Sequence, residues 1–193
     1  MPILTVLLIL GGIAVVLGLV AVGVYNSLVS GKVETENAWS QIDVQLKRRY
    51  DLIPNLVETV KGYAKHESET LERVIQARNM AMSAAGSGNR EQQMQAENQI
   101  TGALKTIFAL SESYPDLKAN ENFKGLQEEL SSTENRIGFA RQHYNDSVGS
   151  YNTTLQKFPN NIIGGMFRFM PVAFFQLDEA EKAAVRTAPK VQF

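Results

Sequence analysis

The sequence contains no cysteine, only two histidines and no charged side chain among its first 31 residues. The lack of cysteine excludes disulfide bonds, thiol nucleophiles and attachment of a lipid through a thiol. Neither histidine lies in a Glu-x-x-His or His-Glu-x-x-His pattern, so the ligands of a di-iron or zinc site are missing. Gly-x-Ser-x-Gly and phosphate-binding loop motifs are also absent. We therefore expect no enzyme activity and no metal or cofactor site.

The uncharged N-terminal stretch is an almost unbroken run of Ile, Leu, Val, Ala and Gly over residues 2–24. A helix of about 20 apolar residues crosses a hydrocarbon core of about 30 Å, so residues 1–31 are expected to form a single transmembrane anchor. A cleaved signal peptide is the alternative, but it would have basic residues before a shorter apolar run. Within the anchor, Ala14 and Gly18 form a small-x-x-x-small pair, at which two such helices can approach closely.

The 19 basic and 20 acidic residues all follow Gly31 and nearly balance, giving a net charge of -1. This balance argues against nucleic acid as a partner, because such binding needs a concentrated basic face. Lys32 and the basic run at 47–49 favour a cytoplasmic location for the bulk of the chain under the positive-inside rule. The run itself has two interpretations, a site for anionic head groups or a partner, and a solvated helix face. Its members are Lys47, Arg48 and Arg49.

The chain after the anchor, residues 32–157, has the apolar period of helices and no strand-like alternation, which predicts an all-α fold. The first helix is expected over residues 34–81, with a kink at Pro54, whose missing N–H leaves the Tyr50 carbonyl without its helical partner. A glycine-rich segment at 83–89 predicts a reversal of the chain before a second helix over residues 91–111. The predicted core stripe of the first helix is Trp39, Ile42, Leu46, Tyr50, Ile53, Val57, Val60 and Ala64.

A third helix has a heptad pattern typical of a coiled coil. Its large seam residues recur every seven positions, at Phe123, Leu130, Ile137, Tyr144 and Tyr151. The positions between them shrink along the helix, from Leu126 through Thr133 and Ala140 to Ser147. We favour packing of this seam within the bundle, and a seam reserved for another subunit is the alternative.

Residues 158–193 form an aromatic-rich C-terminal segment that contains six of the nine phenylalanines. Within it, residues 162–175 are apolar except for Arg168 and are too few to cross a bilayer. A large exposed apolar patch is rare on a monomer, so the segment is expected to dock on the bundle, to be buried between subunits, or to lie in the membrane interface. Its candidate interaction residues are Phe167, Phe169, Phe174 and Phe175.

Residues 37–57, NAWSQIDVQLKRRYDLIPNLV, resemble the signature of the bacterial LemA family. The resemblance continues at 60–64 (VKGYA), 66–67 (HE), 114–120 (YPDLKAN), 140–141 (AR), 144–145 (YN), 158–159 (FP) and 188–193 (APKVQF). It covers essentially the whole chain. It implies a single-pass protein of the bacterial inner membrane with a long antiparallel helical bundle. It brings no catalytic residue, and some members of the family are associated with magnetosome membranes or linked with membrane metalloproteases.

These features predict a membrane-anchored helical scaffold or interaction protein that self-associates, with the lipid bilayer and a second copy of the chain as partners. The heptad seam, the small pair in the anchor and the aromatic C-terminal segment motivate this hypothesis. Two alternatives follow mainly from the family resemblance. One is an adaptor or regulator of a membrane metalloprotease, and the other is a membrane-shaping protein.

Overall fold

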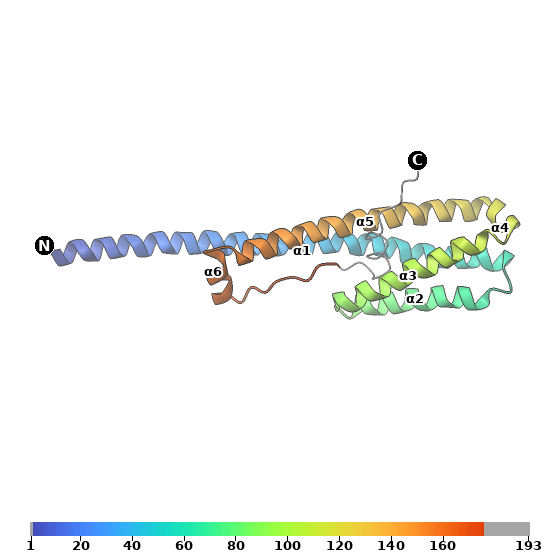
Figure 1. Ribbon diagram of the computed structural model, residues 1–193, viewed down its shortest axis with the longest axis horizontal. Helices are drawn as coiled ribbons and strands as arrows, with labels where there is room; N and C mark the ends of the chain where they lie inside the picture. Colours follow the sequence, from blue (N-terminus) through green and yellow to red (C-terminus); the bar gives the residue numbers. More distant parts are fainter. Residues whose placement is uncertain (1, 176–193) are drawn as a thin grey trace, which may run out of the picture. The chain divides into compact units, whose positions relative to one another are not determined.

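The computed structural model describes residues 2–175, and this part of the chain contains six α-helices and no strand (Figure 1). The helices are α1 (Pro2–Tyr63), α2 (Ser68–Gly86), α3 (Arg90–Ser111), α4 (Pro115–Ala119), α5 (Glu121–Gln156) and α6 (Asn160–Met166). The expected all-α fold with a long N-terminal apolar helix is therefore confirmed. The closing motif at 188–193, including Phe193, lies outside the described residues.

The described chain forms two compact units, and both α1 and α5 contribute to each of them. The anchor unit consists of residues 2–41 and 140–174. The bundle unit consists of residues 42–139 together with Phe175.

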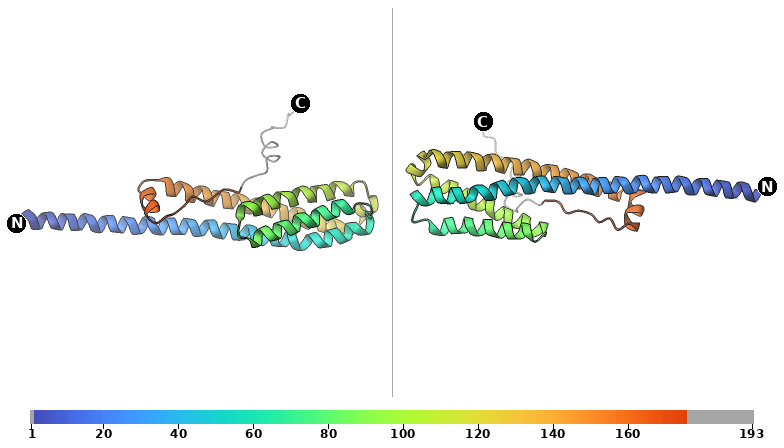
Figure 2. Two further views of the ribbon diagram at one scale, coloured as in Figure 1. Left: turned by 90° about the horizontal axis from the view of Figure 1, so that it is seen from below. Right: turned by 180° about the vertical axis from the view of Figure 1, so that it is seen from behind.

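In the bundle unit, residues 42–63 of α1, the helices α2 and α3, and residues 121–139 of α5 lie side by side (Figure 2). Each helix turns an apolar face inward, as its 3.6-residue period predicts. The predicted stripe of α1 from Ile42 to Ala64 is buried in this unit, and so are the seam residues Phe123, Leu130 and Ile137 of α5. The remaining members, Trp39, Tyr144 and Tyr151, are buried in the anchor unit. The seam is thus occupied within the chain itself, which agrees with its interpretation as bundle core.

The turn at residues 64–67 corrects the expected helix over residues 34–81, because α1 ends at Tyr63 and α2 begins at Ser68. Gly62 weakens the helix just before its end. The Glu67 N–H then donates to the Ala64 carbonyl at 3.1 Å, and the Tyr114 hydroxyl donates to the Glu67 carboxylate at 3.2 Å. Glu67, which interrupts the apolar stripe in the sequence, therefore marks a chain reversal.

Local capping explains where two of the later helices begin. Gly88, at φ 71°, makes the left-handed turn after α2 that a side chain would disfavour. The Asn89 side chain then accepts a hydrogen bond from the Gln92 N–H at 3.2 Å and caps α3. Asn120 does the same for α5, accepting from the Phe123 N–H at 2.9 Å. The reversal predicted from the glycine-rich segment 83–89 is thereby confirmed.

In the anchor unit, residues 140–156 of α5 lie along α1, and α6 follows at the end of α5 (Figures 1 and 2). The core of this unit is formed by Leu28, Tyr151 and Leu155, with Val24, Phe169 and Val172 packed around it. Gly164 allows α6 to approach this core, because a Cβ there would stand 2.5 Å from the Leu155 side chain. Beyond these contacts, α1 continues toward the N-terminus without a neighbouring helix (Figure 1).

Candidate functional site

The N-terminal part of α1 is an apolar rod with no neighbouring helix in the described chain. Its 18-residue window of highest hydropathy averages 2.9 and is 0% buried, so this helix is long and apolar enough to cross a membrane. Ala14 and Gly18 both lie on its exposed surface, and apart from adjacent residues and the backbone of the helix itself no described atom stands within 4 Å of the position of a Cβ on Gly18. Leu28 is fully buried and marks the point at which α1 has entered the core of the anchor unit.

The four phenylalanines of the C-terminal segment have different environments. Phe169 is half-buried against the core of the anchor unit and Phe175 is buried, whereas Phe167 and Phe174 are 56% and 47% exposed. Phe167 and Phe169 both contact the Tyr25 ring edge-on, with ring centroids 4.8 and 5.7 Å apart. Part of the segment is therefore docked on helices of its own unit, and part remains open.

Hydrogen bonds from α5 hold the extended stretch at residues 170–173 in the anchor unit. The Tyr144 and Tyr151 hydroxyls donate to the carbonyls of Ala173 (2.9 Å) and Met170 (3.1 Å). Asn152 pairs twice with Val172, accepting from its N–H at 2.9 Å and donating to its carbonyl at 2.8 Å. The two tyrosines of the heptad seam are thus both buried in the core and donors to this stretch.

The three basic residues at positions 47–49 do not share one surface. Lys47 is exposed, and Arg48, with 46% of its side chain exposed, pairs with Glu129 at 2.7 Å. The Arg49 side chain is fully buried. Lys47 and Arg48 are therefore the members of the run that remain on the surface, and Arg49 belongs to the core of the bundle unit.

Arg49 lies at the centre of a buried polar cluster that joins α1, α3 and α5. Its guanidinium donates to the carboxylates of Glu97 on α3 and Glu134 on α5, and to the Thr101 hydroxyl at 3.1 Å. The Tyr50 hydroxyl donates to the second oxygen of Glu97. A buried charge is tolerated only when it is paired and hydrogen-bonded, which these contacts achieve.

The electrostatics of the cluster follow from burial and from its two carboxylates. Burial disfavours the charged guanidinium, but the attraction of Glu134 and Glu97 outweighs burial and raises the pKa of Arg49. Burial, followed by the Glu97 charge and the hydrogen bond to it, raises the pKa of Tyr50 well above its ordinary value of 10.0. The folded protein therefore keeps Arg49 charged and Tyr50 neutral.

The raised pKa of Tyr50 predicts a loss of stability at alkaline pH. Below pH 10 the hydroxyl is protonated in both states, and above it the unfolded chain releases a proton that the folded chain retains. The free energy of unfolding then falls by up to about 1.4 kcal/mol per pH unit. Denaturant titrations between about pH 9 and pH 12 are expected to show this slope reduced in Tyr50→Phe. Equal slopes in the two proteins would contradict the assignment.

A side chain of α2 replaces the backbone hydrogen bond that Pro54 removes from α1. The Arg78 Nε donates to the Tyr50 carbonyl at 2.8 Å, the same carbonyl that lacks an amide partner at position 54. α1 continues through Pro54 as a single helix. Arg78 interrupts the apolar period of α2, and its side chain supplies the donor that the Tyr50 carbonyl lacks because of Pro54. A kink at Pro54 stays a prediction.

We expect Arg78→Met to lower the free energy of unfolding by about 1–3 kcal/mol, because the Tyr50 carbonyl loses its donor. In a Pro54→Ala background the alanine N–H is able to bond that carbonyl, so the same substitution should cost about 1 kcal/mol less. Chemical unfolding of the four proteins in mild detergent, followed by circular dichroism, measures this coupling. Arg73→Met, at an exposed position of the same helix, is the control. A cost of Arg78→Met that is equal in both backgrounds would refute the replacement.

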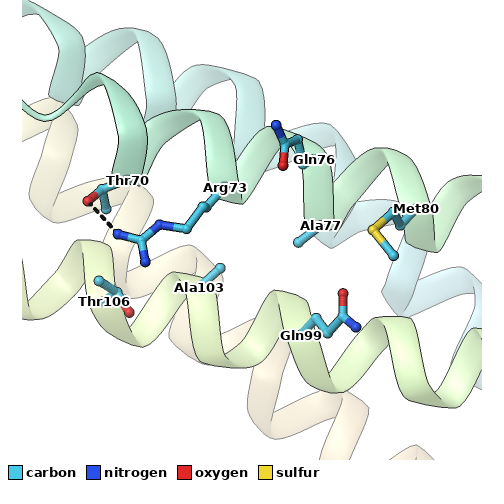
Figure 3. Close-up of a pocket in the computed structure, with 8 residues that line it drawn as sticks. All are labelled: Thr70, Arg73, Gln76, Ala77, Met80, Gln99, Ala103 and Thr106. Carbon is cyan, nitrogen blue, oxygen red and sulfur yellow. Dashed lines mark hydrogen bonds between the residues drawn. The ribbon is translucent and has the colours of Figure 1, made fainter.

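A groove runs between α2 and α3 in the bundle unit. Two adjoining cavities of about 340 and 520 Å³ form it, and they share Met80 and Gln99. Figure 3 shows Ala77 and Ala103 facing each other across the first cavity, where Arg73 extends toward α3 and donates to Thr70 at 3.3 Å. Small side chains thus hollow the surface of this helical hairpin, and polar ones rim it.

Sequence reasoning missed Glu97, Arg78 and Asn152. A signal for Glu97 exists, because Gln93 and Glu97 extend the stripe of Ile100 backward at helical spacing, and both are buried. Gln93 donates to Asp43 at 2.9 Å, a second polar link between α1 and α3. For Asn152 the apolar period carries no comparable signal, since its role is to pair with backbone.

Comparison with known proteins places this architecture in a family. The model of the LemA family matches residues 38–193. Protein LemA of Metamycoplasma hominis is 30% identical over 170 residues, which are 88% of this chain and 76% of the relative. Magnetosome protein MamQ 2 of Paramagnetospirillum magneticum and magnetosome protein MamQ of Magnetospirillum gryphiswaldense are each 24% identical, over 79% and 78% of this chain. The chain spans 64% of the length of either magnetosome protein.

None of these names describes an enzyme. The relatives and the exposed apolar helix together support a membrane-associated helical protein. The match of the family model over most of the chain and the identity to Protein LemA lead to one assignment: this chain belongs to the LemA family.

Proposed function

We propose that the chain is a membrane-anchored scaffold or interaction protein, without catalytic activity, that self-associates at the bacterial inner membrane through its N-terminal anchor. The observation that carries this proposal is the unpartnered anchor surface around Ala14 and Gly18. Helices in lipid associate where small residues let their backbones approach closely. The heptad seam of α5 is buried within the chain, so the anchor is the better surface for a second copy.

The surface charges support a cytoplasmic location for the bundle unit. Lys32 lies just beyond the apolar span, and Lys47 and Arg48 follow on exposed positions of the same helix. Basic residues close to the end of a span are retained on the cytoplasmic side. Labelling of single introduced cysteines in intact cells with a membrane-impermeant reagent tests this orientation, and the absence of native cysteine keeps the background clean.

Light scattering of the full-length protein in mild detergent tests self-association. We expect a mass above that of one chain, and a shift toward the monomer in Ala14→Leu/Gly18→Leu, because the larger side chains separate the backbones. Val16→Leu/Val20→Leu enlarges side chains on the opposite face of the helix and should leave the mass unchanged. A wild-type protein that stays monomeric over a wide concentration range would sink the proposal.

An adaptor or regulator of a membrane protease is the second candidate, and the groove between α2 and α3 favours it. The groove has an alanine floor and a polar rim, which suits a segment of a partner protein. Ala77→Leu/Ala103→Leu fills the floor and is expected to abolish crosslinks to such a partner in native membranes without changing self-crosslinks. Recovery of self-crosslinks alone from the wild-type protein would count against the adaptor.

A further inference from the structure

Contacts in the anchor unit show which part of α1 the C-terminal segment packs against. The uncharged apolar run ends at Val24, and 23 residues of helix span about 34 Å, which matches a hydrocarbon core. Tyr25 follows directly, at the level where aromatic side chains are enriched in membrane proteins. Because Phe167 and Phe169 pack on the Tyr25 ring, the segment around α6 lies at the end of the span.

One side of this segment is docked and its position is fixed. Gly164 is buried against Leu155 and Leu28, and Phe169 and Val172 pack against the same core. Hydrogen bonds from Tyr151 and Asn152 secure the stretch that follows. The orientation of the other side is therefore set by folded contacts.

The other side is an apolar surface that the described chain does not cover. Large apolar side chains on α6 and just before and after it are 81%, 53%, 72% and 72% exposed, and the two within α6 lie one helical turn apart. These residues are Phe158, Ile162, Met166 and Met170, which we name the exposed C-terminal stripe. Phe167, 56% exposed, widens it. A monomer in water rarely exposes so many large apolar groups together.

We propose that the exposed C-terminal stripe inserts into the head-group and acyl boundary of the same bilayer that α1 spans. Continuity favours lipid as the occupant, because the stripe adjoins the end of an anchor with an apolar 18-residue stretch that is 0% buried in the described chain. Lys157 and Arg168 are exposed on either side of α6, where basic side chains reach phosphates while apolar neighbours insert. The proposal rests on the membrane span of α1 and is independent of self-association.

Site-directed spin labelling tests the depth of the stripe, and the natural lack of cysteine makes every introduced cysteine unique. Full-length Met166→Cys and Met170→Cys are labelled with a nitroxide in vesicles of phosphatidylcholine and phosphatidylglycerol. Accessibility is measured to oxygen, which concentrates in lipid, and to a water-soluble nickel complex. Leu10→Cys, in the span, is the lipid reference, and Gln142→Cys, exposed on α5 of the same unit, is the aqueous reference.

We expect the ratio of oxygen to nickel accessibility at both stripe positions to exceed that at Gln142→Cys severalfold and to approach that at Leu10→Cys. An aqueous ratio at both stripe positions, with a lipid ratio at Leu10→Cys, would overturn the insertion and leave the anchor intact. Low accessibility to both reagents, with concentration-dependent spin–spin broadening, would also overturn it, because a second copy would then cover the stripe. An aqueous ratio at Leu10→Cys would remove the anchor and the insertion together. Circular dichroism of each labelled protein confirms that it retains the wild-type helix content.

Discussion

Arg49→Met is expected to lower the free energy of unfolding of the bundle unit by about 3–5 kcal/mol, the largest effect of any single substitution that we predict. The substitution leaves the Glu97 carboxylate buried without a cation, and burial of an uncompensated charge is costly. Methionine fits the volume of the arginine stem, so the loss reports on charge more than on packing. Denaturant unfolding of the full-length protein in mild detergent, followed by circular dichroism, measures it.

Two companion variants separate charge from the loss of a contact. Arg48→Met removes an ion pair whose partners are both more than 40% exposed, so its cost should stay below about 1 kcal/mol. Arg49→Met/Glu97→Gln removes the orphaned charge but keeps an acceptor for the Tyr50 hydroxyl. It should be more stable than Arg49→Met alone. Equal losses of unfolding free energy in Arg48→Met and Arg49→Met would show that the buried cluster contributes no more to stability than the exposed ion pair.

Deletion of residues 2–20 is expected to move the protein from the membrane fraction to a largely soluble one. Each Leu, Ile or Val in the centre of a span contributes roughly 0.3 to 0.6 kcal/mol to insertion, and the deleted stretch consists mostly of these residues. The cut precedes Val24, Tyr25 and Leu28, so the core of the anchor unit is kept. Fractionation of cells, with a carbonate wash of the membranes, measures the shift.

A replacement of residues 2–20 by a mixture of leucine and valine of the same length is the matched control. It should restore the membrane fraction, because insertion depends on hydrophobicity and length. It should not restore self-association, since the pair Ala14 and Gly18 is then gone. A deletion variant that resists the carbonate wash as well as the full-length protein would contradict the role of α1 as the anchor.

The helical fold was predictable because apolar residues recur along the sequence at the spacing of a helix. From Trp39 to Ala64 every member of the predicted stripe is buried, and the seam residues of α5 are buried in the same way. The boundary at Tyr63 was not predictable from that period, because Leu71 and Val74 resume an apolar face after the turn and mimic a continuing helix. When the residues on both sides of a chain reversal are apolar, the reversal hardly disturbs the helical spacing of apolar residues.

The buried polar contacts were harder to predict from the sequence, because they depend on which helices pack against each other. In sequence, Arg49 is one of three consecutive basic residues, and only the position of α3 and α5 sets it apart from Lys47. Arg78 reads as an interruption of a stripe until its partner, the Tyr50 carbonyl, is known. Partners 28 to 85 residues away along the chain cannot be inferred from local spacing.

The contact between Arg78 and the Tyr50 carbonyl makes the bending stiffness of α1 near Pro54 a property that is shared between two helices. An isolated helix would be soft at this point, since one rung of its hydrogen-bond ladder is missing. When α2 is docked, the Arg78 Nε replaces the missing backbone donor and lies 2.8 Å from the Tyr50 carbonyl oxygen. We therefore expect detachment of α2 from the bundle unit to soften α1 near Pro54, next to the buried Arg49 cluster, and re-docking of α2 to restore its stiffness.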